Sequence, residues 1–250
     1  MIAAITGATS GIGRAIAFQL ASHEYDLILT GRREKLLNEI SQTLTFEFGI
    51  RILPLCFDIR KKEEAEKYLG HLPSEWQNVD VLVNNAGLAA GFHPIHEGDL
   101  ADWEQMIDTN IKGLLYATRY IVPLMTARQS GHIINISSIA GKEVYPNGNV
   151  YCATKHAIEG LTKGMRIDLL PYGIKVTSIS PGAVETEFSL VRFKGDEKRA
   201  KEVYKGYQPL KAEDIAEAVW FALSRPPHVN INDILIMPAA QANAVFFDRK

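Results

Sequence analysis

The stretch Thr6-Gly7-Ala8-Thr9-Ser10-Gly11-Ile12-Gly13 decides the fold, because it joins a short apolar run to a helical pattern. Glycines allow a sharp turn and a close approach of the backbone to a bound group. A helix that begins there presents unpaired N–H groups and the positive end of its dipole. The stretch predicts a strand–turn–helix unit that binds a pyrophosphate, although a tight turn with no ligand would have a similar composition.

Strand-like and helix-like segments alternate along the rest of the chain. Short runs rich in Val and Ile are typical of buried parallel strands, and they occur at Ile2–Thr6, Asp26–Thr30, Arg51–Phe57, Val79–Asn84, His132–Ile136, Ile174–Ser180 and Ile231–Met237. Helical periodicity is clearest at Ile12–Ser22, Arg33–Phe46, Asp99–Ala127, Tyr151–Leu170 and Ala212–Ser224. This alternation predicts an α/β protein: a single-domain, doubly wound (Rossmann) parallel sheet of about seven strands over residues 1–250, with helices on both faces.

The stretch Glu185–Leu210 fits the alternation poorly, since it is charged and also contains several aromatic residues. It is predicted to be either an insertion, at about residues 185–210, that covers a site or a pair of exposed surface helices.

Composition excludes several classes of partner. The net charge of -2 over 250 residues gives no support for binding nucleic acid or an acidic membrane. The two cysteines, Cys56 and Cys152, are far apart, which argues against a disulfide scaffold and against a metal site. The first residues lack a basic leader, and no run of about 18 apolar residues occurs. We therefore expect a cytoplasmic protein with no transmembrane helix.

The end of the second predicted strand favours NADP(H) over NAD(H). Enzymes of this fold that use NAD place an acidic residue here, where it binds the ribose 2′-hydroxyl. This chain has Gly31 followed by Arg32 and Arg33. Guanidinium groups bind a 2′-phosphate through charge-assisted hydrogen bonds. The alternative is that both arginines belong only to an exposed helix start, where positive charge is unfavourable with the dipole.

A tyrosine and a lysine are spaced as a catalytic pair would be. Tyr151 and Lys155 lie four residues apart, hence on one face of a predicted helix. Ser138 precedes Tyr151 by 13 residues, after a strand, at the sheet edge where ligands bind. An ammonium about 4 Å from a phenol would lower the phenol pKa by about three units before desolvation opposes it. Tyr151 is thus predicted to act as the general acid or base, with Ser138 bound to the substrate oxygen.

In this order and context, the glycine stretch, Ser138 and the Tyr-x-x-x-Lys pair resemble the short-chain dehydrogenase/reductase family. The resemblance covers nearly the whole chain. It implies a hydride transfer between a nicotinamide and a carbonyl or alcohol, with Ser138, Tyr151, Lys155 and Asn110 as the catalytic group. Asn110 would help to hold a water that connects Lys155 to solvent; the alternative is an exposed helical asparagine.

The same resemblance implies the set of residues that contact NADP(H). It comprises Gly7, Thr9, Ser10, Gly11, Ile12, Gly13, Arg32, Arg33, Asp58, Ile59, Asn85, Ala86, Gly87, Tyr151, Lys155, Pro181, Gly182, Val184 and Thr186. In the family, the pair matching Asp58 and Ile59 contacts the adenine ring. The segment Pro181–Thr186 packs around the nicotinamide, and Lys155 could also bind the nicotinamide ribose.

A closer resemblance concerns the NADP-dependent 3-hydroxy acid dehydrogenases of bacteria and yeast. It is carried by Leu72–Trp76, Asp102–Asn110, Val191–Asp196 and His228–Asn232. It implies substrates such as serine, 3-hydroxypropionate and malonic semialdehyde. The stretch Gly141–Asn149 departs from the pattern and is expected to face the substrate.

A carboxylate substrate needs a cation in its pocket. Arg192 or Lys194, in the poorly fitting segment, is predicted to supply it; the alternative is two exposed basic residues. The family also implies a homotetramer. Other functions remain open at this point: a carbonyl reductase of wider range, including 3-oxoacyl thioesters, or an NADP(H)-binding module without catalysis.

Overall fold

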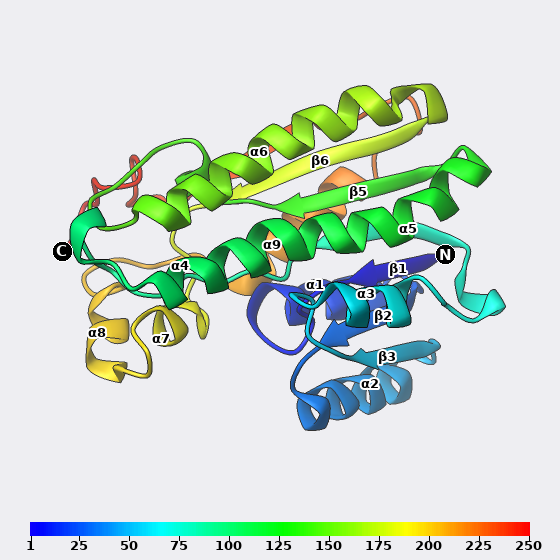
Figure 1. The fold of residues 1–250 in the computed structure, drawn as a ribbon, viewed down its shortest axis with the longest axis horizontal. Helices are drawn as coiled ribbons and strands as arrows, with labels where there is room; N and C mark the ends of the chain where they lie inside the picture. The colour runs from blue at the N-terminus through cyan, green and yellow to red at the C-terminus, as the bar shows by residue number, and fades with distance from the viewer.

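A computed structural model describes residues 1–250 and contains one seven-stranded sheet, as predicted (Figure 1). The strands are β1 (Ile2–Ile5), β2 (Asp26–Gly31), β3 (Ile52–Cys56), β4 (Val79–Asn84), β5 (Gly131–Ile136), β6 (Ile174–Pro181) and β7 (Asp233–Ile236). All neighbouring pairs are parallel, in the order β3-β2-β1-β4-β5-β6-β7. The strand order reverses between β1 and β4, which is where ligands bind in open α/β sheets.

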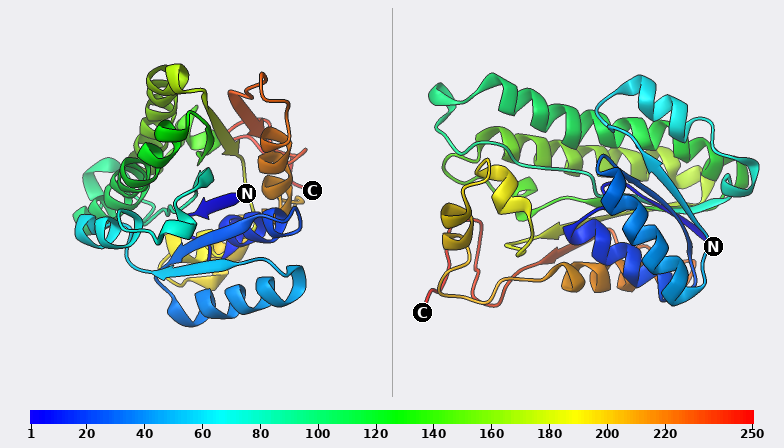
Figure 2. Two further views of the ribbon diagram at one scale, coloured as in Figure 1. Left: turned by 90° about the vertical axis from the view of Figure 1, so that its right-hand side faces the viewer. Right: turned by 90° about the horizontal axis from the view of Figure 1, so that it is seen from below.

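Two apolar layers cover the faces of the sheet (Figure 2). On one face lie α1 (Gly11–Ala21), α2 (Glu34–Phe48) and α9 (Ala212–Leu223). On the other lie α3 (Lys62–Leu69), α5 (Leu114–Arg128) and α6 (Asn149–Leu169). Single turns of 3₁₀ helix occur at Ser74–Trp76, Ile95–Glu97, Ile139–Gly141 and Leu170–Tyr172. Both faces of the central strands are buried, which explains their continuous apolar runs.

The long helix predicted at Asp99–Ala127 is interrupted in its middle. Helix α4 (Leu100–Ile107) passes into a π-helical turn at Asp108–Gly113 and then into α5. Such turns are rare and often occur at functional sites. Here the wide turn carries Asn110, which is 1% exposed, so the alternative of an exposed asparagine is excluded.

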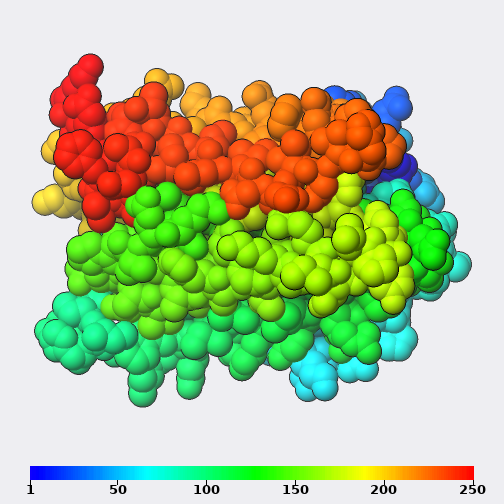
Figure 3. All heavy atoms as spheres, turned by 90° about the horizontal axis from the view of Figure 1, so that it is seen from above, coloured from blue at the N-terminus to red at the C-terminus, as the bar shows by residue number.

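The poorly fitting segment and the end of the chain meet at the carboxyl edge of the sheet. Helices α7 (Phe188–Arg192) and α8 (Glu197–Glu202) lie there beside the C-terminal segment (Figures 1 and 2). The amide of Lys250 donates to the carbonyl of Gly206 at 2.8 Å. Figure 3 shows α6 between α5 and the C-terminal segment; the C-terminal segment is the part drawn in orange and red. None of the helices has both the length and the apolar character needed to cross a bilayer.

Candidate active site

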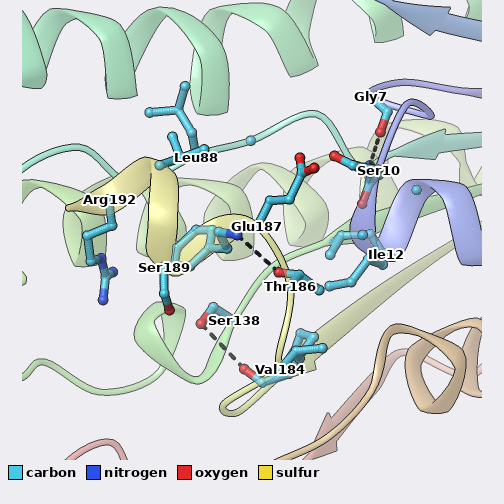
Figure 4. Close-up of a pocket in the computed structure, with 18 of the residues that line it drawn as sticks. Gly7, Ser10, Ile12, Leu88, Ser138, Val184, Thr186, Glu187, Ser189 and Arg192 are labelled. Carbon is cyan, nitrogen blue, oxygen red and sulfur yellow. Dashed lines mark hydrogen bonds between the residues drawn. The ribbon is translucent and has the colours of Figure 1, made fainter. Parts of the chain in front are cut away.

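A cleft of about 730 Å³ opens at the carboxyl edge of the sheet. Every residue predicted to contact the cofactor lines it, together with Ser138 and Arg192. Its walls come from the glycine loop, the ends of β2, β4, β5 and β6, and the segment that contains α7. The close-up in Figure 4 shows residues of these walls facing a common space. Asn110 and Lys194 lie outside its lining.

The glycine loop has a backbone that side chains would disrupt. Gly7 and Gly11 adopt φ of +69° and +51°, a region that favours glycine. A Cβ on Gly13 would lie 2.3 Å from the carbonyl oxygen of Gly7. The side-chain amide nitrogen of Asn85 donates to that carbonyl at 3.1 Å and to the carbonyl of Thr6 at 2.8 Å. Asn85 therefore holds the loop in shape as well as lining the cleft.

The N-terminus of α1 opens into the cleft and fits an anionic group. Ser10 precedes α1 without capping it through its side chain. The first backbone N–H groups of the helix therefore remain available to an anion. The glycine loop has no room for side chains, and it lies next to a helix N-terminus with unpaired N–H groups. The two features together suit a pyrophosphate.

Arg33 lies beside this loop at the start of α2. Its Nη2 donates to Ser10 Oγ at 2.6 Å and to Thr9 Oγ1 at 3.1 Å, and its Nη1 pairs with Glu187 Oε2 at 2.9 Å. A guanidinium that already binds a carboxylate also fits a phosphate. Gly31 is needed because a Cβ there would lie 2.5 Å from Thr9 Cγ2. Thus Arg33 faces the cleft and is not merely an exposed helix start.

Tyr151 and Ser138 converge from α6 and from the turn after β5. Ser138 Oγ accepts from the amide of Ala140 at 3.1 Å and donates to the carbonyl of Pro181 at 3.4 Å. Burial raises the pKa of Tyr151 well above its ordinary value, while the Arg192 guanidinium and the Ser138 hydroxyl act in the opposite direction. The Tyr151 hydroxyl therefore keeps its proton at physiological pH. The expected net lowering of its pKa is not found, because burial outweighs the groups that act in the opposite direction.

Lys155 is buried behind Tyr151. Its Nζ donates to the carbonyl of Ile136 at 3.0 Å and lies 5.9 Å from the centre of the Tyr151 ring. Burial lowers the pKa of Lys155 to about 8, and the carboxylate of Glu159 partly offsets this. A Cβ on Gly87 would lie 3.6 Å from the same Nζ. The ammonium thus lies within contact distance of Gly87 and lines the cleft beside Tyr151.

Asn110 lies close to this lysine, but its hydrogen bonds go to the chain itself. Its amide nitrogen donates to the carbonyl of Leu88 at 2.9 Å and to Thr154 Oγ1 at 3.0 Å. Its oxygen accepts from the amide of Leu88 at 2.8 Å. These bonds join the π-helical turn to the chain beyond β4 and to α6. A water bound by Asn110 stays a prediction.

Glu159 is a charged residue near the site that the sequence analysis missed. It lies on α6, four residues after Lys155, and is buried. Its Oε1 accepts from Ser178 Oγ at 2.8 Å and from Ser180 Oγ at 3.0 Å, and its Oε2 pairs with Lys142 at 3.1 Å. The spacing that relates Tyr151 to Lys155 also relates Lys155 to Glu159, so the same helical reasoning could have found it.

Arg192 is surrounded by aromatic rings inside the cleft. Its guanidinium carbon lies 4.9 Å from the ring centre of Tyr151, 5.0 Å from that of Phe188 and 5.7 Å from that of Tyr145. Its Nη2 donates to the Tyr145 hydroxyl at 2.6 Å. Its Nε is buried without a partner. A guanidinium that lines the cleft beside Tyr151 suits an anionic group of a substrate.

Lys194, the other cation considered for the substrate, is placed differently. Its Nζ pairs with Asp102 at 3.0 Å and with Asp99 at 3.5 Å. It follows the end of α7 with φ of +51°, and it is not among the residues that line the cleft. Of the two cations, only Arg192 faces Tyr151.

Comparisons with known proteins agree with this geometry. The family model described as short chain dehydrogenase matches residues 1–196. The chain belongs to this family. It is 46% identical over 245 residues to the NADP-dependent 3-hydroxy acid dehydrogenase of Salmonella typhi, covering 98% of this chain and 97% of that protein. It is 42% identical over 246 residues to sulfoacetaldehyde reductase 2 of Chromohalobacter salexigens, covering 98% and 97%.

The family likeness extends to solved structures. The closed form of a serine dehydrogenase complexed with NADP⁺ superposes with a TM-score of 0.92 at 45% identity, covering 100% of each chain. These comparisons confirm the family predicted from the motifs, and the resemblance to the 3-hydroxy acid dehydrogenases within it.

The pKa of about 8 for Lys155 leads to an expected pH profile in the direction of carbonyl reduction. We expect kcat/KM to be flat below about pH 8 and to fall above it. Lys155 then loses its positive charge, whereas Tyr151 keeps its proton because its pKa is raised. Initial rates with a 3-oxo acid across pH 6–10 measure this.

Glu159→Gln should move the falling limb of that profile to lower pH, because it removes the carboxylate that favours the charged lysine. Asp168→Asn, an exposed change near the end of the same helix, serves as the control. If kcat/KM fell at the same pH in Glu159→Gln and in the parent protein, the fall would not be caused by the titration of Lys155.

Proposed function

We propose that the protein is an NADP(H)-dependent oxidoreductase that transfers a hydride between the nicotinamide and a 3-hydroxy acid or its 3-oxo acid. Substrates of the serine, 3-hydroxypropionate and malonic semialdehyde type fit this role. One observation carries the proposal: the guanidinium of Arg192 lines the cleft and lies 4.9 Å from the centre of the Tyr151 ring. The names of the Salmonella dehydrogenase and of the serine dehydrogenase structure support the same substrate class.

The residues around the cleft would hold NADP(H) along its length. The glycine loop and the start of α1 suit the pyrophosphate, and Arg33 with Arg32 suits the 2′-phosphate. Asp58 and Ile59 line the cleft and would contact the adenine, and Asn85, Ala86 and Gly87 would contact the middle of the cofactor. Pro181, Gly182, Val184 and Thr186 also line the cleft and would surround the nicotinamide, together with Tyr151 and Lys155. When bound, the nicotinamide supplies or accepts the hydride.

The side chains of the protein handle the proton and the developing charge. In reduction, the Tyr151 hydroxyl donates its proton to the carbonyl oxygen of the substrate, and in oxidation the phenolate takes it back. Ser138 Oγ donates a hydrogen bond to that oxygen as charge develops. Lys155 favours the phenolate that remains after proton transfer and binds the nicotinamide ribose. Asn110 anchors the π-helical turn behind Lys155 and holds the water that links it to solvent.

Arg192 would select substrates that carry an anion. A carboxylate that pairs with the guanidinium of Arg192 would bring the neighbouring hydroxyl or carbonyl group toward Tyr151. The aromatic rings around it exclude water, which strengthens the ion pair. Lys194 is not retained in this role, because Asp99 and Asp102 already pair with it.

A cytoplasmic location and a homotetramer are also proposed. Both cysteines are free thiols, as a reducing compartment would keep them. Apolar side chains are exposed on α4, α5 and α6, among them Leu100, Leu115 and Ile167, and could pack against other subunits. Light scattering coupled to size exclusion would measure the mass in solution, and a monomer would contradict the tetramer.

The proposed function is tested by initial rates with NADP⁺ and NAD⁺ against L-serine, 3-hydroxypropionate and a plain secondary alcohol. We expect turnover of the hydroxy acids with NADP⁺, and much slower turnover with NAD⁺ or with the alcohol. Turnover of the alcohol alone would instead indicate a carbonyl reductase of wider range. A 2-hydroxyethyl sulfonate should be added, because a sulfonate could also pair with Arg192 and one relative is a sulfoacetaldehyde reductase.

A further inference from the structure

The carboxylate of Glu187 faces the guanidinium that is proposed to bind the 2′-phosphate. The two residues lie 154 positions apart in sequence, yet Arg33 Nη1 and Glu187 Oε2 are 2.9 Å apart. Arg33 comes from the start of α2 and Glu187 from the segment before α7, so the pair spans the cleft. Figure 4 shows Glu187 directed toward Ser10 of the glycine loop.

The Nε and Nη2 donors of Arg33 are already used on the loop side. Nε donates to Thr9 Oγ1 at 3.3 Å, and Nη2 donates to Thr9 Oγ1 at 3.1 Å and to Ser10 Oγ at 2.6 Å. Nη1 is the edge that binds an anion, and Glu187 supplies that anion. A carboxylate oxygen and a phosphate oxygen accept from a guanidinium in the same geometry. Glu187 therefore accepts at a position that a phosphate oxygen could occupy.

This ion pair is suited to exchange. The side chains of Arg33 and Glu187 are 43% and 54% exposed, so solvent screens their attraction. A phosphate monoester carries between one and two negative charges at neutral pH and competes well for the same edge. If Glu187 stayed in place beside a bound phosphate, the two anions would repel each other.

We propose that Glu187 competes with the cofactor 2′-phosphate for Arg33 and thereby sets how strongly the protein prefers NADP(H) to NAD(H). The inference rests on the proposed role of Arg33. NAD(H) lacks the 2′-phosphate and does not need to displace Glu187. Repulsion of the pyrophosphate by Glu187 would weaken both cofactors equally. Direct repulsion of the 2′-phosphate would weaken NADPH alone, but it would persist without Arg33, so the ratio of the two affinities, compared with and without Arg33, reports the competition.

The test is the Kd of NADPH and of NADH for Glu187→Gln, measured by titrating nucleotide fluorescence at one fixed ionic strength. We expect the Kd of NADPH to fall about fivefold, as for loss of a partly exposed competing ion pair, and that of NADH to change by less than about twofold. Glu185→Gln removes the same charge two residues earlier and is not paired with Arg33, so it should leave both Kd values unchanged.

Arg33→Ala distinguishes a failure of the competition by Glu187 from a failure of the proposed role of Arg33 in binding the 2′-phosphate. The variant should weaken NADPH binding selectively, and adding Glu187→Gln to it should have no further effect. If Arg33→Ala left the preference for NADPH unchanged, the 2′-phosphate site would lie elsewhere and the inference would fail with it. If Arg33→Ala weakened NADPH binding but Glu187→Gln left it unchanged or weakened it, the competition alone would be overturned.

Discussion

Tyr151→Phe is expected to lower kcat by about 10³-fold or more, because it removes the hydroxyl proposed to donate the proton to the substrate oxygen. The variant keeps the ring, so the contact of Tyr151 with Phe188, whose ring centres lie 5.5 Å apart, should survive. The chain should therefore fold normally. Turnover of a 3-oxo acid with NADPH measures the loss, with both reactants saturating so that kcat is separated from KM.

The control for this variant is cofactor binding. NADPH titrated by fluorescence should bind Tyr151→Phe nearly as tightly as the parent protein, and the melting temperature should be unchanged within a few degrees. A variant that kept a tenth or more of the parent kcat would show that another group donates the proton. Ser138→Ala should also lower kcat, by less, because its hydroxyl stabilises charge but supplies no proton in the proposed mechanism.

Arg192→Ala is expected to lower kcat/KM for 3-hydroxy acids by about 10- to 150-fold, the range for a hydrogen bond to a charged group at about 1.5–3 kcal/mol. Its guanidinium lines the cleft 4.9 Å from the centre of the Tyr151 ring, so the loss should fall on substrates with a carboxylate. A plain secondary alcohol should lose little. The ratio of kcat/KM for the acid to that for the alcohol is the measured quantity.

Two matched variants test whether the effect is local. Lys194→Ala removes the neighbouring cation that pairs with Asp102, and Arg199→Ala removes a cation that packs on Phe193 at 4.5 Å. Neither residue lines the cleft. Both variants should keep kcat/KM for the acid within about twofold. An equal loss in all three variants would indicate a general effect of charge on the α7–α8 segment and would contradict a direct contact by Arg192.

The seven strands and the paired helical layers could be predicted from the sequence, since a parallel sheet buries its central strands on both sides. The glycine loop was predictable for a similar reason, because its unusual backbone needs glycine at fixed positions. The interruption of the helix at Asp108–Gly113 could not be predicted from the sequence. A π turn widens a helix without changing its apolar face enough to appear in a periodic pattern.

Short-range spacing therefore determined the class of fold and the pairing of Tyr151 with Lys155, because helical geometry alone places residues i and i+4 on one face. Only the tertiary structure decided the rest. Arg192 and Lys194 are two residues apart and chemically alike, but the end of α7 lies between them and directs them to different partners. The pair of Arg33 with Glu187 joins segments 154 residues apart. Such contacts depend on which strand ends lie together at the sheet edge, and local sequence preferences do not specify this.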